Sequence, residues 1–334
     1  MARQSRGLFA RLRRYSLAGR RADRRLRQIS DAAPGVMPAP SLLNRFNGPQ
    51  PKIYGRVGSL EVRLACGLRD LRRAQRLRYK VFYEEMSATP SAAAKRSRRD
   101  EDAFDAVCDH LLVVDTSPVA KAAQPWRSNR RSRVVGTYRV LRQDMLADGE
   151  TFYTQSEYDL RKLLADRQGT HKFMELGRSC VLPPYRNKRT VELLWHGLWT
   201  YCREHNIAAM MGCASFEGTD PAAHAEALSF LHHERRAPSE WCVRAHDDLY
   251  VDMNMMARDA VNPKRALKAL PPLIKGYLRV GAYVGDGAVI DHQFGTTDVF
   301  IILPVEAIDP RYFGHFGAPD ERESRIAVEK VPAE

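Results

Sequence analysis

The 334-residue sequence is 44% hydrophobic and 28% charged, a composition typical of soluble globular proteins. It contains no apolar run of about 18 residues, which excludes a membrane-spanning helix. Its six cysteines stand singly, without CxxC pairs, which argues against a zinc site and against a secreted disulfide framework. We therefore expect a cytoplasmic protein without a metal site, built as one large domain or two small ones.

The net charge of +13 is concentrated at the N-terminus. Residues 1–30 hold ten arginines against one aspartate, and Leu8, Leu12 and Tyr15 fall at helical spacing among them. Such a basic amphipathic stretch is typical of a segment that lies on an anionic membrane or contacts an acidic partner, and a solvated tail explains it equally well. A mitochondrial transit peptide has a similar composition. Nucleic-acid binding is disfavoured, because aromatic residues do not alternate with the arginines as a stacking platform requires.

Composition also divides the chain. We expect residues 1–58 to form the basic arm and a linker rich in proline and glycine, 59–317 to form the folded domain, and 318–334 to form a charged tail. Within the domain, residues 116–133 are predicted to be an exposed excursion between two strands.

Hydrophobic periodicity predicts mixed strands and helices in the domain. Asp70 is placed to cap a helix that runs through Met86. The other predicted elements are, in chain order, strands at 59–65, 110–115 and 133–142, a helical region near 156–167, a strand at 173–182, a helix from its cap at Thr190 to Asn206, a strand at 207–215, a helix near 222–233 and a strand at 298–306. This pattern favours an α/β or α+β fold around one sheet.

The strand at 173–182 carries three candidates for chemistry. Glu175 is unusual in a strand and is costly to bury unpaired, so it is either a general base or the partner of a nearby arginine such as Arg178. A separation of three places these two side chains on opposite faces, unless a bulge at Gly177 re-aims one of them. Cys180 shares its face with apolar residues, and we interpret it as a buried hydrophobe rather than a nucleophile.

A basic turn follows this strand. Arg186, Lys188 and Arg189 flank the start of the helix that Thr190 is expected to cap. Free backbone N–H groups and the helix dipole favour an anion there, and three cations add to that effect. We interpret the turn as a phosphate site, with a solvated basic loop as the alternative.

Several of these residues carry a resemblance. The stretches "LRYKVF", "EDAFD", "VVGTYRVL" and "MELGR" resemble positions of the acyl-homoserine-lactone synthases, which belong to the GCN5-related N-acyltransferase (GNAT) fold. The corresponding residues are Arg78, Phe82, Asp102, Asp105 and Arg139 as substrate-binding positions, and Glu175 and Arg178 as catalytic positions. A tryptophan expected shortly after Phe82 is absent, and this chain is longer.

A closer resemblance spans about 60–317. The stretches "ELGRSCVLPPYRNKRT", "GCASFEGTDP" and "LPPLIKGYLRVGAYVGDGAVIDHQFGTTDVFIILPVEAIDPRYF" resemble the bacterial L-ornithine Nα-acyltransferases. That family makes lyso-ornithine lipid from L-ornithine and a 3-hydroxyacyl-acyl carrier protein. The resemblance implies a GNAT-like sheet flanked by helices, no tightly bound cofactor, acyl-phosphopantetheine on acyl carrier protein as donor, and a location on the inner membrane face. It argues against a transit peptide.

The basic turn departs from the common GNAT turn, in which glycines let backbone amides touch the pyrophosphate of coenzyme A. Aligned on Arg186, the sequence places Arg189 and Val191 where glycines are expected. We therefore expect Arg186, Lys188, Arg189 and Thr190 to serve the single phosphodiester of carrier-bound phosphopantetheine.

The resemblance leaves the substrate contacts open. Glu175 is the expected base, Arg139 or Arg178 the partner of the ornithine carboxylate, and Asp102 or Asp105 the partner of its δ-ammonium, with an exposed acidic loop as the alternative for the two aspartates. Backbone N–H groups near residues 179–181 are expected to stabilise the oxyanion. Adjacent Asp291 and His292 point in opposite directions in an extended segment, which favours a structural role. A different amine acceptor, or a basic membrane- or nucleic-acid-binding protein without enzymatic activity, remains an alternative.

Overall fold

The computed structural model describes residues 51–86, 88–117 and 133–308. The predicted arm at 1–30, the tail at 318–334 and most of the excursion at 116–133 lie outside these residues. Within the described part, no helix combines the length and apolarity needed to cross a membrane.

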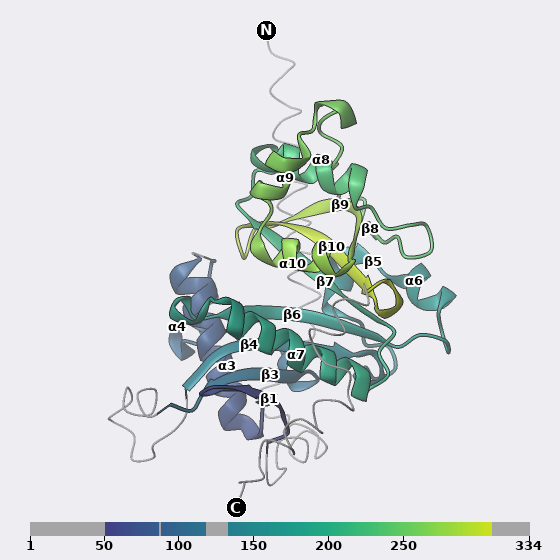
Figure 1. Cartoon of the computed structure of the whole chain (residues 1–334). Helices are drawn as coiled ribbons and strands as arrows, with labels where there is room; N and C mark the ends of the chain where they lie inside the picture. Colours follow the sequence, from purple (N-terminus) through teal and green to yellow (C-terminus); the bar gives the residue numbers. More distant parts are fainter. Residues whose placement is uncertain (1–50, 87, 118–132, 309–334) are drawn as a thin grey trace, which may run out of the picture.

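A single sheet of ten strands runs through the described part of the chain, in the order β1-β2-β3-β4-β6-β7-β10-β9-β8-β5 (Figure 1). The strands are β1 Ile53–Val57, β2 Leu60–Leu64, β3 Asp109–Asp115, β4 Arg133–Arg142, β5 Tyr158–Asp159, β6 Phe173–Val181, β7 Ala209–Glu217, β8 Arg244–Ala245, β9 Tyr283–Asp291 and β10 Thr296–Pro304. Neighbours are antiparallel except in the β6–β7 and β8–β9 pairs, which are parallel. The expected mixed sheet is therefore confirmed.

Helices cover the sheet. They are α3 Gly67–Tyr79, α4 Ala92–Ser97, α6 Arg161–Asp166, α7 Lys188–Glu204, α8 Ala225–Glu234, α9 Pro263–Ala269 and α10 Pro272–Val280, and a π-helical turn η1 Lys80–Glu85 continues α3. Short 3-10 turns are η2 Ala103–Ala106, η3 Gln143–Met145, η4 Tyr153–Ser156, η5 Pro183–Tyr185, η6 Pro221–His224, η7 Arg258–Ala260 and η8 Val305–Ala307.

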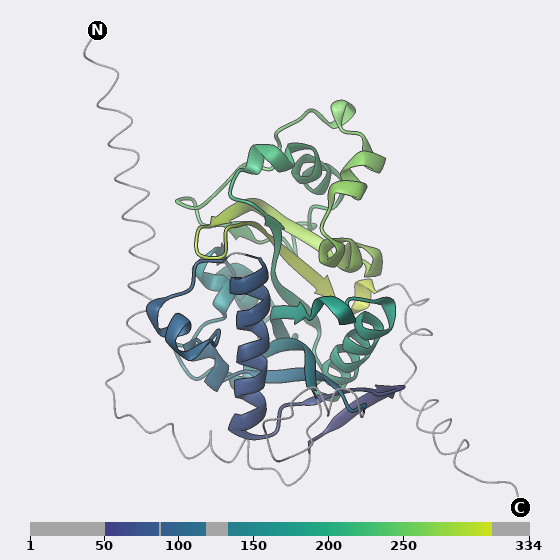
Figure 2. The same cartoon turned by 90° about the vertical axis from the view of Figure 1, so that its left-hand side faces the viewer.

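Helices α3 and α7 lie on opposite faces of the first half of the sheet (Figure 2). Alternation along β2 accounts for this arrangement, because successive side chains of a strand point to opposite faces. Val62 packs against Gly197 of α7, whose missing side chain lets the helix approach. Arg63 points the other way and donates a 2.6 Å hydrogen bond to Asp70 of α3.

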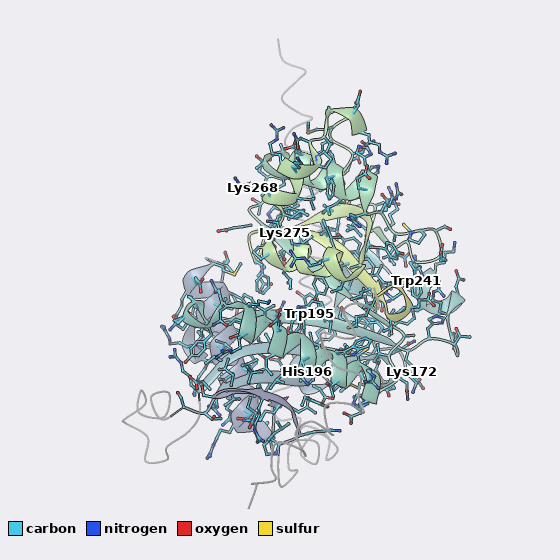
Figure 3. All side chains as sticks on the ribbon, in the orientation of Figure 1. Lys172, Trp195, His196, Trp241, Lys268 and Lys275 are labelled. Carbon is cyan, nitrogen blue, oxygen red and sulfur yellow. The ribbon has the colours of Figure 1, made fainter. Side chains whose placement is uncertain are left out.

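Helix α7 also joins the two halves of the molecule. On one side, His196 Nε2 donates to the carbonyl of Tyr54 in β1 at 3.0 Å. On another, Trp195 packs edge-on against Tyr277 of α10 with 5.2 Å between ring centroids. Figure 3 shows Trp195 on the side of α7 that faces α10. Helix α10 thereby contacts α7, which itself packs on strands β1 to β4.

Most predicted elements are confirmed, and three boundaries are wrong. β1 forms inside the range predicted to be linker, and it pairs with β2, so the folded domain begins before residue 59. Helix α3 is capped at Cys66, and Asp70 instead accepts a 3.1 Å bond from the Cys66 amide. Helix α7 is capped by Asn187, whose side chain accepts from the Thr190 amide, so Thr190 is not the cap.

Strands β6 and β7 pair over one short stretch and then separate. The pairing joins Phe173–Glu175 to Ala209–Met211. Gly212 follows directly, and a side chain there would bring its Cβ within 2.3 Å of the carbonyl oxygen of Leu176. The two backbones therefore touch at the point where the strands part, and only glycine permits that contact.

We predict that Gly212→Ala lowers the free energy of unfolding by about 1–3 kcal/mol, because a backbone carbonyl cannot move aside as a flexible side chain can. Urea denaturation measures the change. Gly276→Ala in α10 is the matched control, since its added Cβ meets no atom within 4 Å and alanine favours a helix. Equal stability of the two variants would contradict the prediction.

Candidate active site

A cavity of about 570 Å³ lies where β6 and β7 separate. Residues 176–181 of β6 form one wall, and residues 213–215 of β7 form another. Among the predicted site residues, those that line it are Phe82, Arg139, Glu175, Arg178 and Arg186. The other predicted residues do not line it: Arg78, Asp102, Asp105, Lys188, Arg189 and Thr190.

Behind the cavity wall, three arginines and three aspartates form a buried ionic network. Arg78, with 0% exposure, donates to both oxygens of Asp105 at 2.8 and 2.7 Å. Arg139 reaches the same carboxylate at 3.2 Å. Both bonds of the Arg78 pair are charge-assisted and bidentate, the strongest arrangement available to these groups.

Asp100 and Asp102 extend this network to Arg178. Arg139 Nη1 lies 2.6 Å from Asp102 Oδ1, and Arg178 Nη2 lies 3.2 Å from Asp102 Oδ2. Asp100 Oδ2 lies 2.8 Å from Arg78 Nε and 3.3 Å from Arg178 Nε. Burial alone would raise the pKa of Asp102, but Arg139 and Arg178 lower it below its ordinary value. The network is thus balanced in charge, and the sequence did not single out Asp100.

The strand carries a bulge at Arg178. Thr137 of β4 pairs with Cys180 while Arg139 pairs with Gly177, so β6 holds one residue too many there. Arg178 itself has a φ of 51°. The bulge predicted at Gly177 therefore lies one residue later, and Glu175 and Arg178 both line the cavity.

Aromatic rings hold the Arg178 guanidinium. Its central carbon lies 4.9 Å from the ring centroid of Tyr153 and 4.6 Å from that of Phe294. Phe294 also packs edge-on against Phe82, with 5.8 Å between the centroids. These cation–π contacts fix the arginine at the cavity wall and link β6 to the β9–β10 turn.

Glu175 is fastened to the turn η4. Its two carboxylate oxygens accept the backbone N–H groups of Tyr153 at 2.9 Å and of Thr154 at 2.6 Å. Burial raises the pKa of Glu175, while these two amides and Arg139 oppose the rise. A carboxyl whose proton affinity is raised by burial suits acid–base chemistry near neutral pH.

The basic turn is only partly available to an anion. Arg186 forms a two-point ion pair with Glu85, one bond of which measures 2.8 Å. Lys188 lies 3.6 Å from Glu192 on the next turn of α7. Thr190 is fully buried, with its hydroxyl toward Asn187. The Thr190 amide is already bonded to the Asn187 side chain, so the amides of Lys188 and Arg189 are the helix-terminal donors left to favour an anion at this turn.

The cavity also holds three acids; Glu157 and Asp298 were not singled out from the sequence, and Asp291, for which a structural role was expected, lines the cavity with them. Glu157, Asp291 and Asp298 place carboxylate oxygens within 4.8 Å of one another. They follow η4, end β9 and lie in β10, so only the folded sheet brings them together. A weak signal was present, because two of these acids flank the "HQFGTT" turn.

Cys180 is 7% exposed, and burial raises the pKa of its thiol to about 12. A neutral thiol of this kind is a poor nucleophile, in agreement with its interpretation as a buried hydrophobe.

Comparison with known proteins matches residues 77–196 to the family model "Acetyltransferase (GNAT) domain". The L-ornithine Nα-acyltransferase of Brucella abortus is 52% identical over 81% of this chain and 93% of its own length. That of Rhodobacter capsulatus is 39% identical over 76% of this chain and 93% of its own length.

This chain belongs to the L-ornithine Nα-acyltransferase family. It is an acyltransferase with a GNAT fold, as the resemblance implied. Among solved structures, an N-acyl amino acid synthase from uncultured soil microbes matches at 12% identity and a TM-score of 0.39, over 77% of this chain and 93% of that one. A coenzyme-A-dependent acyl-homoserine lactone synthase matches at 12% identity and a TM-score of 0.39, over 76% and 85%. These two likenesses are too distant to bear on function.

In this family member, the pKa values of Glu157 and Asp298 are raised, so these two carboxyl groups ionise only at a cost in free energy. Burial and the charge of Asp298 raise the pKa of Glu157 to about 8, from an ordinary 4.5. Asp291 adds to that rise, whereas the Cys213 thiol and Arg178 oppose it. A carboxyl with a raised pKa destabilises the fold as pH rises from its unfolded value through its folded one.

We predict that Glu157→Gln removes this loss. Wild type and variant should be equally stable near pH 4, and the variant should gain over wild type up to about pH 8 and then hold its advantage. Denaturant unfolding across this pH range measures the difference, which should reach a few kcal/mol. The exposed Glu240→Gln is the control and should follow wild type. Parallel curves for Glu157→Gln and wild type would contradict the prediction.

Proposed function

We propose that this enzyme transfers a 3-hydroxyacyl group from acyl carrier protein to the α-amino group of L-ornithine, giving lyso-ornithine lipid. The choice of L-ornithine as acceptor rests on the 52% sequence identity to an L-ornithine Nα-acyltransferase, which extends over 93% of the length of that protein. The cavity supports it, because arginine and carboxylate groups share one wall and match an amino acid with an extra ammonium.

The gap between β6 and β7 is the proposed place of the donor. Beyond Glu175 the two strands no longer pair, so an extended pantetheine chain can lie along β6 as a further strand would. The phosphodiester would then reach the start of α7, beside Arg186, Lys188 and Arg189. Because Arg189 stands where a glycine is expected, this turn suits one phosphate better than a pyrophosphate. Residues 1–30 are proposed to hold the enzyme on the anionic inner membrane surface.

The reaction itself needs little beyond positioning, since the thioester is already activated. The neutral α-amine attacks the carbonyl carbon, the C–N bond forms, and the C–S bond breaks. The amine proton passes to Glu175, directly or through water, and the departing thiolate takes up a proton. Arg178, held at the cavity wall, would bind the substrate carboxylate, and backbone N–H groups near residues 179–181 would stabilise the oxyanion.

Incubation of the full chain with L-ornithine and matched 3-hydroxyacyl donors tests the proposal. We expect a product with the mass of ornithine plus the acyl group minus water, and fragmentation should place the acyl group on the α-nitrogen. The carrier-protein donor should give a kcat/KM higher by roughly tenfold or more than the coenzyme A donor, since protein contacts add to its recognition. Absence of acylated ornithine would refute the function; equal use of both donors would refute only the carrier preference.

Glu175→Gln tests the base. We expect kcat to fall by about 10²-fold or more, because general-base catalysis contributes that much, and the acidic limb of the pH–rate profile to disappear. Glutamine can accept only one of the two amide bonds from η4, so a lower rate alone does not separate catalysis from anchoring. A slow variant that keeps the acidic limb would assign Glu175 to anchoring, and a near-wild-type rate would remove it from both roles.

A further inference from the structure

One corner of the cavity gathers three carboxyl groups without a balancing cation among the described residues. Glu157, Asp291 and Asp298 all line the cavity, and their carboxylate oxygens lie within 4.8 Å of one another. Among the described residues, none of the three forms an ion pair within 4.0 Å of a lysine, arginine or histidine nitrogen. Burial, together with the repulsion between carboxylates this close, raises the pKa values of Glu157 and Asp298, and a cation placed among the three would favour their charged forms.

The cavity's arginines do not supply the missing charge. Arg139 and Arg178 pair with aspartates of the buried network, at 2.6 and 3.2 Å from Asp102. Arg186 pairs with Glu85 at the other end of the cavity. The acidic corner therefore lacks a fixed counter-ion from the described part of the protein.

Unpartnered polar atoms point to a ligand in this corner. Asp298 Oδ1 and Thr296 Oγ1 are buried, each residue being only 6% exposed, and neither atom has a hydrogen bond of ordinary geometry to a described residue; the neighbouring Ser215 and Thr296 side chains only partly offset the raised pKa of Asp298. Both residues line the cavity. Leaving such groups unsatisfied is costly, so a donor that enters the cavity is expected to meet them.

The other acids of the cluster are held in place by donors of their own. The Cys213 thiol donates to Glu157 at 3.1 Å, and the amides of Gln293 and Phe294 donate to Asp291 Oδ1 at 2.7 and 3.0 Å. The carboxylates thus have fixed positions before a ligand arrives, which reduces the entropy lost on binding.

We propose that Glu157, Asp291 and Asp298, with the Thr296 hydroxyl, bind the side-chain ammonium of a diamino acid acceptor. This assignment rests on the proposed function and deepens it. A nucleophilic amine must lose its proton before it attacks, whereas a cluster of carboxylates favours a charged ammonium. The cluster therefore suits the ammonium that stays protonated, and the α-amine lies toward Glu175.

A monovalent ammonium fits the surroundings better than a divalent metal ion. The charge of Arg178 is close enough to oppose the raised pKa values of Glu157 and Asp298. A fixed positive charge penalises a doubly charged ion twice as much as a singly charged one. The same arginine favours a ligand that carries a carboxylate beside its ammonium, as an amino acid does.

Comparison of L-ornithine with L-norvaline, which lacks only the side-chain amine, tests the cluster. Wild type should prefer ornithine in kcat/KM, and both Asp298→Asn and Glu157→Gln should reduce that preference by roughly ten- to a hundredfold, mainly through the KM for ornithine. Asp166→Asn, an exposed acid on α6, is the matched control and should keep the wild-type preference. Calorimetric binding of the two amino acids to the same proteins gives the preference without turnover.

The outcomes separate the two proposals. Failure of wild type to acylate ornithine would refute the proposed function, and the calorimetric preference would still decide the cluster. An unchanged ornithine preference in both variants would overturn the cluster assignment. Elemental analysis tests whether the cluster binds a metal ion instead. A stoichiometric divalent metal in wild type that is lost in Asp298→Asn would overturn the ammonium assignment in favour of a metal site.

Discussion

The buried pairing of Arg78 with Asp105 is the interaction on which the site depends. It joins the end of α3 to the segment before β3, and Asp102 and Asp100 continue it to β4 and β6. Burying ions costs several kcal/mol each, and the cost is offset only where every charge has close partners. Because the arginines and aspartates here are equal in number, the network can be buried, and it holds three elements in register around one wall of the cavity.

From that network the geometry of the cavity follows. The π-helical turn that begins after α3 carries Phe82 into the cavity, and the bulge in β6 brings Arg178 to the same side as Glu175. A regular strand would have separated these two side chains. Bulges cost ladder hydrogen bonds, and ion pairs with Asp100 and Asp102 provide the compensation at this one. The ion pairs of Arg178 thereby stabilise the bulge that places Arg178 and Glu175 at the same cavity.

Sequence periodicity was sufficient for elements with strong apolar patterns, such as β3, β4 and β10. It failed for β1, because a short edge strand among prolines and glycines lacks such a pattern. It failed also at Thr190, since Asn187 is an equally good cap and only the structure decides between them. For the site, the family resemblance singled out Arg78 and Asp105, but as substrate-binding residues, whereas the structure places both in the ionic network behind the cavity wall. Asp100, Glu157 and Asp298 were not singled out, because the residues around each of them in the structure are distant in sequence and come together only in the folded sheet.

Charged groups in this molecule fall into two sets: those with a close partner of opposite charge and those without one. The chain is strongly basic overall, at +13, yet the described cavity balances its arginines with aspartates and leaves the acids of its far corner unbalanced. The positive net charge of the chain would favour the proposed acidic carrier protein through long-range attraction, which acts on the rate of encounter. An acidic corner favours a cationic acceptor through short-range contacts, which act on affinity and selectivity. The two proposed substrates, of opposite charge, would therefore be recognised by different groups of the same enzyme.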